Sequence, residues 1–278
     1  MGVRLIMYMP ENEISNKTSN ETSNEIVSEP SSAPLQEIPK PKPKNFLSMR
    51  PASSGKWMAY TSILFVAFIS FAVWRDGFGL DIDLGSWLTA SPAQVFGQHQ
   101  YWRLFSTIFV HADLQHLASN LLFFGGLAFL LNGYFGYWAF PVLSLLAGGL
   151  TNLIALFTYP ESVTLVGASG VVYFMAAFWL TLYFFIERRR TVVRRINECL
   201  ALTLVLLMPS TFEPHVSYRT HGIGYLMGVV FGVVYFLRNR QNIRRAERGP
   251  NVEGDVKVKP AVVEDTFKVY FVPVSCHD

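Results

Sequence analysis

The stretch SGVVYFMAAFWLTLYFFI, from Ser169 to Ile186, contains no charged residue in its 18 positions. An α-helix needs about 20 mostly apolar residues to cross the hydrocarbon core of a bilayer, so this stretch predicts a membrane-spanning helix. Five more apolar segments accompany it between residues 57 and 238. The sequence therefore predicts an all-α membrane protein, a bundle of six transmembrane helices. The other five segments are Trp57 to Trp74, Asp113 to Leu131, Tyr134 to Tyr159, Glu198 to Met208 and Thr220 to Leu237. We expect a tight turn at Asn132-Gly133 between the second and third segments, and a bend of the third segment at Pro141 and the Gly148-Gly149 pair.

The composition of the whole chain indicates a membrane-embedded core with polar ends. Of the 278 residues, 51% are hydrophobic and 15% are charged, and the mean hydropathy is +0.28, which argues against an ordinary soluble fold. Residues 57–238 hold only 17 of the 43 Asp, Glu, Lys and Arg residues. A disulfide scaffold is excluded because the two cysteines, Cys199 and Cys276, lie in unrelated segments.

Two polar tails flank the apolar block. In residues 1–56, the part from Pro10 to Lys44 consists mainly of Asn, Ser, Thr, Glu and Pro, so it cannot bury enough apolar surface to offset its ordering entropy. We expect this tail to be disordered. Residues 239–278 are predicted to form a second tail. The basic run RNRQNIRRAERG after Leu237 is interpreted as a topology signal and solvated helix end, with contact to anionic lipid headgroups as the alternative.

The distribution of lysine and arginine predicts the orientation in the membrane. The N-terminal tail has 7 of them, the loop after the fourth segment has 5 and the part of the chain after Leu237 has 8, which is 20 of the 23 in the chain. We therefore expect a multi-pass protein of the plasma (inner) membrane with both termini in the cytoplasm. The fifth segment is short enough to be an interfacial helix, although an even number of spans is needed to keep both basic tails on one side.

Chemically capable side chains collect where three predicted helices begin on the outer side. His111, His116 and Asn120 open the second helix, Ser169 opens the fourth and His221 opens the sixth. Polar groups inside a bilayer are costly and indicate function by default. A single serine is more often a packing residue, and a single histidine an interfacial anchor. Because the whole set is expected at a similar shallow depth, we interpret it as one site.

A stripe of small residues predicts which helices meet. Spacings of three and four residues put its members on one helix face, where they let another backbone approach closely. If the partner is the fourth helix, which presents Gly170 and Ala177, this approach carries His221 toward Ser169. The stripe consists of His221, Gly224, Gly228 and Gly232.

A serine and a histidine brought together in this way suit nucleophilic catalysis. The Ser169 hydroxyl is a weak nucleophile until a base such as His221 takes its proton. The small residues Gly167 and Ala168 leave the Ser169 N–H open to an oxyanion, and the helix dipole aids that interaction. Further donors on the facing helix are His116 and Asn120.

Three motifs resemble the rhomboid family of intramembrane serine proteases. They are QYWRLFSTIFVHADLQHLASN (Gln100 to Asn120), GASGVVY (Gly167 to Tyr173) and HGIGYLMG (His221 to Gly228), and the resemblance covers about residues 57–238. It implies a rhomboid-like bundle of six helices and a hydrolase that works through a Ser–His dyad. The protein would cleave transmembrane segments of other membrane proteins.

The resemblance also implies a role for each matching residue. Ser169 would be the nucleophile and His221 the general base, with an oxyanion hole formed by His116, Asn120 and the Ser169 backbone. The supporting positions would pack around the site or shape the first external loop, which is expected to lie partly in the membrane interface. They are His111, Gly167, Gly170, Tyr173, Gly224, Gly228 and the pair Trp102 and Arg103.

The expected partners are transmembrane protein substrates and the lipid bilayer, with no nucleic acid. The chain has no HExxH motif, phosphate-binding glycine loop or CxxC pair, so the sequence predicts neither a metal nor an organic cofactor. Two alternatives remain. A non-catalytic rhomboid-like protein would bind membrane clients, but such relatives typically lack the dyad. A small channel or transporter is disfavoured because no charged residue lies deep in a predicted helix and no inverted repeat is evident.

Overall fold

The computed structural model describes residues 45–79, 83–207 and 217–248, and the regular structure in these ranges is helical. The prediction of an all-α membrane protein is confirmed. Most of the two predicted tails, residues 1–44 and 249–278, lies outside the described residues.

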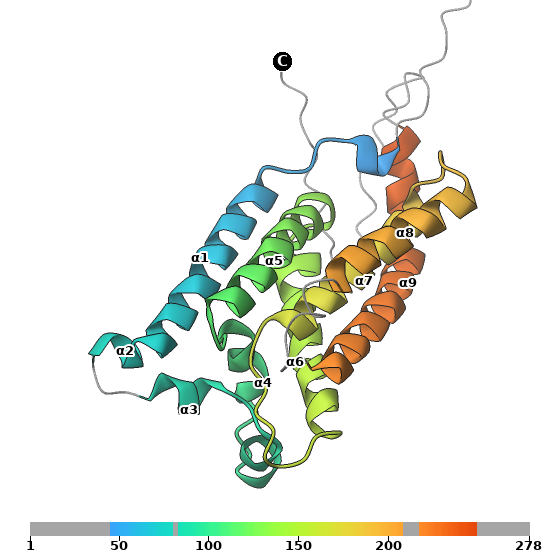
Figure 1. Ribbon diagram of the computed structural model, residues 1–278. Helices are drawn as coiled ribbons and strands as arrows, with labels where there is room; N and C mark the ends of the chain where they lie inside the picture. Colours follow the sequence, from blue (N-terminus) through green and yellow to red (C-terminus); the bar gives the residue numbers. More distant parts are fainter. Residues whose placement is uncertain (1–44, 80–82, 208–216, 249–278) are drawn as a thin grey trace, which may run out of the picture. The chain divides into compact units, whose positions relative to one another are not determined.

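Five helices in the described part of the chain are long and apolar enough to cross a membrane (Figure 1). They are α1 (Ser54–Trp74), α5 (Leu114–Phe135), η4 with α6 (Trp138–Leu143 and Ser144–Leu156), α7 (Ser169–Ile186) and α9 (Tyr218–Arg248). Each corresponds to one predicted segment, and α7 has the predicted bounds. Helix α1 packs along α5, whereas α7 contacts α5, α6 and α9. Helix α7 is therefore the central element of the bundle.

The fifth predicted segment forms α8 (Val192–Leu207), a helix of 16 residues that is not among these five. At 1.5 Å per residue the described part of α8 is about 24 Å long, which is shorter than the roughly 30 Å hydrocarbon core. Its first half carries Arg194, Arg195 and Glu198, whose charges are costly in hydrocarbon. The count of six spanning helices therefore stays a prediction.

The chain reverses direction after α5 at a different place from the one predicted. The prediction of a tight turn at Asn132-Gly133 is wrong, because α5 continues through these residues to Phe135 and is followed by Gly136, whose φ is +77°. The Asn132 side chain instead donates a 2.9 Å hydrogen bond to the carbonyl of Phe140 inside the core. The expected bend at Pro141 is confirmed, since Phe140 before it has non-helical backbone angles.

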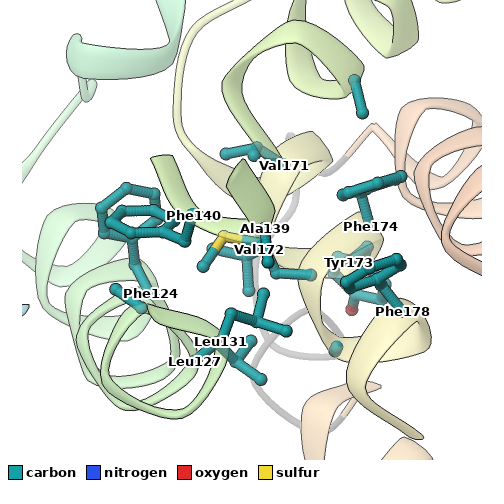
Figure 2. Packing of buried hydrophobic residues seen from close by; sticks show 14 of the residues in the cluster. Phe124, Leu127, Leu131, Ala139, Phe140, Val171, Val172, Tyr173, Phe174 and Phe178 are labelled. Atoms are coloured by element: carbon teal, nitrogen blue, oxygen red, sulfur yellow. The ribbon is translucent and has the colours of Figure 1, made fainter. Parts of the chain in front are cut away.

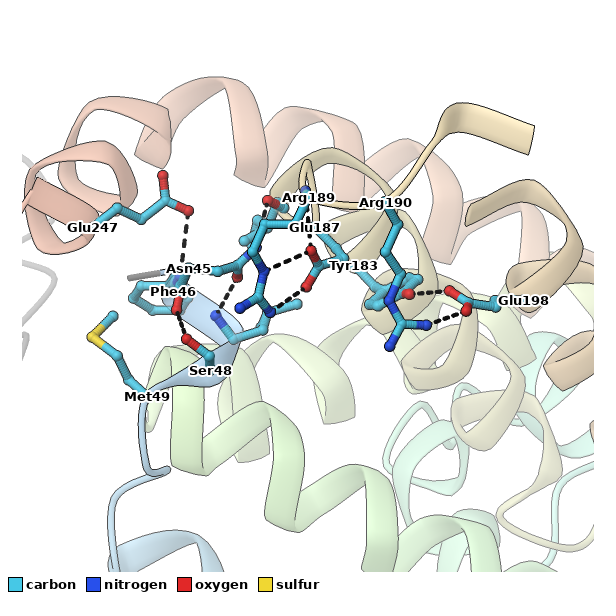
Figure 3. Close-up of polar contacts among 12 residues, drawn as sticks. Asn45, Phe46, Ser48, Met49, Tyr183, Glu187, Arg189, Arg190, Glu198 and Glu247 are labelled. Carbon is cyan, nitrogen blue, oxygen red and sulfur yellow. Dashed lines mark hydrogen bonds and ion pairs between the residues drawn. The ribbon is translucent and has the colours of Figure 1, made fainter. Parts of the chain in front are cut away.

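The segment just before α1, residues 45–49, is here called the N-terminal strap. The sequence predicted disorder through residue 56, and the structure corrects this prediction for residues 45–56. The Phe46 side chain is buried and stacks on Phe135 with ring centroids 5.7 Å apart. An apolar anchor in an otherwise polar tail is enough to order this short stretch. The Asn45 side chain donates a hydrogen bond to the carbonyl of Ile186. The backbone N–H of Phe46 donates to the carboxylate of Glu247 (Figure 3).

Helix α9 is longer than the segment predicted from apolar residues alone. The sequence predicted that the bundle ends at residue 238, but the helix continues to Arg248. The reason is that Asn239, Ile243 and Glu247 are buried on its inner face. The first ten residues of the predicted C-terminal tail, 239–248, therefore belong to the helical body.

Helix α7 is buried along most of its length because helices surround it on several sides. Figure 2 shows Val172, Phe174 and Phe178 of α7 in one cluster with Phe124 of α5 and Phe140 of η4. Lipid tails are as apolar as these side chains, so close van der Waals packing holds membrane helices together more than the hydrophobic effect does. A buried α7 can thus hold its first turn in a defined position.

Short helices fill the loop between α1 and α5, and Arg103 ties them together. The Arg103 guanidinium is buried and donates to the carbonyls of Ser86 and Thr89 at 2.5 and 2.7 Å, and to the side chain of Gln100. These bonds satisfy loop carbonyls that have no helical partner. The short helices of the described chain are η1 (Phe46–Ser48), α2 (Asp76–Gly79), α3 (Leu84–Leu88), η2 (Ala93–Gly97), α4 (Arg103–Ser106) and η3 (Thr107–Phe109).

Candidate active site

Helices α7 and α9 are in backbone contact along the predicted glycine stripe. A Cβ atom added to Gly224 would lie 2.4 Å from the carbonyl oxygen of Gly170, and one added to Gly228 would lie 2.3 Å from that of Phe174. Further down, a Cβ on Gly232 would lie 2.7 Å from Cβ of Thr181. The predicted pairing of these two helices is therefore present, and only glycine fits at these positions of α9. This contact brings the first turns of both helices together.

The imidazole of His221 lies on the face of α7 that carries Ser169. Its ring stacks on Tyr173 with centroids 4.1 Å apart and ring planes 12° apart. Tyr173 follows Ser169 by four residues, so the two side chains share one helix face. The Tyr173 hydroxyl in turn donates a 3.2 Å hydrogen bond to the carbonyl of Leu206 in α8. His221 is buried, whereas Ser169 is half-buried.

The loop before Ser169 is in close contact with His116 of α5. Gly167 has a φ of +105°, and a Cβ atom there would lie 2.7 Å from Nε2 of His116. Both the backbone angle and the close ring require glycine at this position. Asn120, one turn further along α5, is buried and donates a 2.9 Å hydrogen bond to the His116 carbonyl. His116 and Asn120 thus lie on the side of α5 that faces the loop.

His111 holds the same loop against α1. The backbone N–H of Ala168 donates to Nε2 of His111 at 3.2 Å, and Nδ1 of His111 lies 3.1 Å from Oγ of Ser70. Since Nε2 accepts, the proton belongs on Nδ1, which donates to Ser70, whose hydroxyl donates to the Phe109 carbonyl at 3.0 Å. We assign this neutral tautomer from the hydrogen bonds. Burial, with a smaller contribution from His116, lowers the pKa of His111 to about 3.

This lowered pKa predicts a pH-dependent stability. In the unfolded chain a histidine titrates near pH 6.5, so the stabilisation from neutral His111 is complete above about pH 6.5 and is lost as the pH falls toward about 3. Between about pH 6.5 and 5 the expected loss of unfolding free energy is roughly 2 kcal/mol. His111→Gln keeps an acceptor for Ala168 and does not titrate. Thermal unfolding at several pH values should therefore show a smaller pH dependence for this variant.

Exposed His99 provides the matched control for this measurement. His99→Asn removes a histidine without touching the Ala168 loop and should keep the wild-type pH dependence. An equal pH dependence in wild type and His111→Gln would contradict the assignment of His111 as a buried neutral acceptor.

Two contributors to this region were not found from the sequence. The carbonyl of Thr107 accepts a 3.0 Å hydrogen bond from Gly167 N–H, and its hydroxyl donates to the carbonyl of Leu165 at 2.5 Å. Ser70 supports His111 from near the C-terminal end of α1. Small hydroxyl residues in apolar segments are common, and their partners here lie about 40 to 60 residues away, so no local pattern marks them.

The pair Trp102 and Arg103 plays a different part from the residues around the Ala168 loop. The Arg103 side chain is directed at carbonyls of its own loop, and Trp102 is half exposed. The structure thus brings the expected site residues together in two sets of contacts, one on each side of Ser169 in the chain, and it assigns Arg103 to loop order. The first set contains His111, His116 and Gly167, and the second, along the contact between α7 and α9, contains Gly170, Tyr173, His221, Gly224 and Gly228.

The chain is similar to known proteins over this helical region. The family model described as Rhomboid domain matches residues 98–238. Rhomboid-like protease 3 of Toxoplasma gondii is 27% identical over 152 residues, which cover 53% of this chain and 57% of that protein. RHOMBOID-like protein 1 of Arabidopsis thaliana is 26% identical over 176 residues, which cover 59% of this chain and 44% of that protein. The chain spans about half the length of these relatives.

Proposed function

This chain belongs to the rhomboid family, and from that premise we propose that it is an intramembrane serine endopeptidase. Its nucleophile would be Ser169 and its general base His221. It would cleave transmembrane segments of other membrane proteins near their outer ends. The protein would work as a multi-pass protein of the plasma (inner) membrane with both termini in the cytoplasm, as the distribution of lysine and arginine indicates.

The backbone contact between α7 and α9 is the observation that carries this proposal. Gly224, one turn after His221 in α9, contacts Gly170, the residue after Ser169 in α7. The Tyr173 ring then supports the imidazole on the face of α7 that Ser169 shares. A helix pair held together this closely leaves the two side chains little freedom to separate. Pre-positioning of this kind supplies much of the rate enhancement in covalent catalysis.

The proposed reaction proceeds through an acyl-enzyme. Oγ of Ser169 attacks the carbonyl carbon of the peptide bond while His221 takes the hydroxyl proton. His221 then gives this proton to the amine as the C–N bond breaks, and the ester remains on Ser169. A water molecule, deprotonated by the same imidazole, hydrolyses the ester and restores the serine. In the described part of the chain Nδ1 of His221 has no hydrogen-bond partner, so no acidic third member is invoked.

Donors around Ser169 suit the negative charge that develops on the substrate carbonyl. Ser169 is the first residue of α7, so its N–H has no acceptor within the helix and can donate to an oxyanion. His116 lies against the preceding loop, and Asn120 uses one of its two amide hydrogens on the His116 carbonyl. Its second hydrogen remains for the substrate. Each such donor is typically worth about 10² to 10³ in rate.

The membrane limits which substrates can react. In an intact transmembrane helix the backbone carbonyls are already hydrogen-bonded and shielded, so the cleaved segment has to unwind locally. Substrates with small or helix-weakening residues near their outer ends suit this requirement. Water has to reach Ser169 from the outer side as well, which agrees with its half-buried position in the first turn of α7.

A serine-reactive fluorophosphonate probe tests the proposal directly. We expect the wild-type protein in reconstituted membranes to be labelled, with the adduct on Ser169 when the modified peptide is identified by mass spectrometry. Labelling should fall to background in His221→Ala, because the hydroxyl then has no base. A folded wild-type protein that neither takes the label nor cleaves a reporter would overturn the proposal in favour of a non-catalytic protein that binds membrane clients.

A further inference from the structure

Beyond Leu237, helix α9 continues as a strongly basic helix with two different faces. Asn239, Ile243 and Glu247 are buried on the inner face. The other faces carry five arginines, and the buried Glu247 is the single acidic residue between residues 238 and 248. The arginines are Arg238, Arg240, Arg244, Arg245 and Arg248.

Four of these arginines surround an open pocket of about 410 Å³. Its apolar end is Phe236, which is buried and stacks on Phe185 with ring centroids 4.9 Å apart. The next residue, Leu237, is exposed and is the last large apolar side chain on the outer side of α9, so this end of the pocket lies where the outer side of the helix changes from apolar to basic. A pocket with an aromatic residue at one end and cationic groups at the other matches the boundary between lipid tails and headgroups. The lining residues are Phe236, Arg240, Gln241, Arg244, Arg245 and Arg248.

Among the residues that the structure describes, the positive charge of this pocket is largely uncompensated. The nearby carboxylate of Glu247 is already engaged by Arg188 at 2.7 Å and Arg244 at 3.2 Å, and it also accepts a hydrogen bond from Phe46 N–H in the N-terminal strap. In residues 45–79, 83–207 and 217–248 no acidic side chain forms an ion pair with the other three arginines of the pocket. These are Arg240, Arg245 and Arg248.

We propose that this pocket binds the headgroup of an anionic phospholipid. The guanidinium groups of Arg240, Arg245 and Arg248 would donate to the phosphate oxygens, an interaction that arginine makes with good geometry. Gln241 would add a neutral donor, and the acyl chains would run past Phe236 along the bundle. The lipid, rather than a soluble phosphate compound, is favoured by the position of the pocket next to the last apolar turn of α9. Clusters of four or more basic residues beside a membrane helix typically have this property.

The test uses the full-length protein in nanodiscs that contain phosphatidylglycerol and phosphatidylcholine in equal amounts. Native mass spectrometry counts the phosphatidylglycerol molecules that the released protein retains. A basic residue near the membrane surface contributes about 1 kcal/mol, or about fivefold in affinity. The triple variant Arg240→Gln, Arg245→Gln, Arg248→Gln should therefore bind roughly a hundredfold more weakly. Arg238→Gln is the matched control, because Arg238 is exposed on the same helix but does not line the pocket.

Two further arms distinguish binding of the lipid headgroup from a loss of folding and from binding of free phosphate. The triple lysine variant at the same positions keeps the charge and should retain most of the lipid, which would show that the glutamine variant has lost a binding site and not its fold. Inorganic phosphate, added to the protein in nanodiscs of phosphatidylcholine alone, should bind much more weakly than phosphatidylglycerol. Three outcomes would overturn the proposal. They are undiminished retention by the glutamine variant, equal retention of phosphatidylcholine, and equally tight binding of inorganic phosphate.

Discussion

Ser169→Ala is expected to lower the rate of reporter cleavage by at least about 10⁴-fold, because the substitution removes the only group that forms the acyl-enzyme. His221→Ala should lower it by a similar factor, since without a base the hydroxyl stays protonated. Residues that act as one unit are strongly non-additive, so the double variant should be no slower than either single variant. The measurement is cleavage of a helix-weakened transmembrane reporter by the purified protein in proteoliposomes.

Ser162→Ala is the matched control for this experiment. Ser162 is an exposed serine in the loop that follows α6, seven residues before Ser169. Its variant should cleave at the wild-type rate. Cleavage that persists in both dyad variants would have to come from a contaminating protease, and the dyad assignment would then have no support. Loss of cleavage in only one of the two would rule out a Ser–His unit.

Gly228→Ala is expected to impair both stability and cleavage, although it adds a single methyl group. The new Cβ would lie 2.3 Å from the Phe174 carbonyl oxygen and 2.7 Å from the Ala177 Cβ, and neither atom is at the end of a flexible chain. Alanine gains about 1 kcal/mol in helix propensity. Overpacking of a buried contact typically costs about 1–3 kcal/mol, so destabilisation should prevail. The helices must also move apart, and a shift of about 1 Å between catalytic groups can cost about 10²-fold in rate.

Gly222→Ala provides the comparison on the same helix. A Cβ atom at Gly222 has nothing within 4 Å, so this variant gains helix propensity without a clash. Thermal unfolding and reporter cleavage should both stay close to those of the wild type. If Gly228→Ala matched Gly222→Ala in both measurements, close contact between α7 and α9 would not be needed for the site.

Much of the helical architecture was predictable because the signal is local. A run of apolar residues long enough to cross a bilayer defines a helix without reference to other parts of the chain, and α7 has the predicted bounds of Ser169 and Ile186. The glycine spacing in α9 also predicted a close helix contact. The same reasoning failed where polar residues extend a helix. It ended the bundle at residue 238, although Asn239, Ile243 and Glu247 continue the packed face of α9.

The candidate site likewise has residues that the sequence predicted and contacts that only the structure shows. The residue types and their order along the chain indicated Ser169, His221, His116 and Asn120 as the chemically capable set. The sequence did not indicate that His111 accepts a hydrogen bond from Ala168, or that Thr107 holds Gly167. Each of these contacts joins residues about 60 positions apart, and a hydroxyl or imidazole in an apolar segment has many possible partners.

The order of residues along the chain was enough to identify a helical membrane protein of the rhomboid family and to predict the side chains of its candidate site. Only the tertiary structure shows that Phe46 anchors the N-terminal strap against Phe135, that His221 stacks on Tyr173, and that arginines of α9 line a pocket. The difference lies in the range of the interactions. Hydrophobic length and helical spacing act between neighbours in the chain, whereas side-chain packing, hydrogen bonds and ion pairs depend on which distant segments come together.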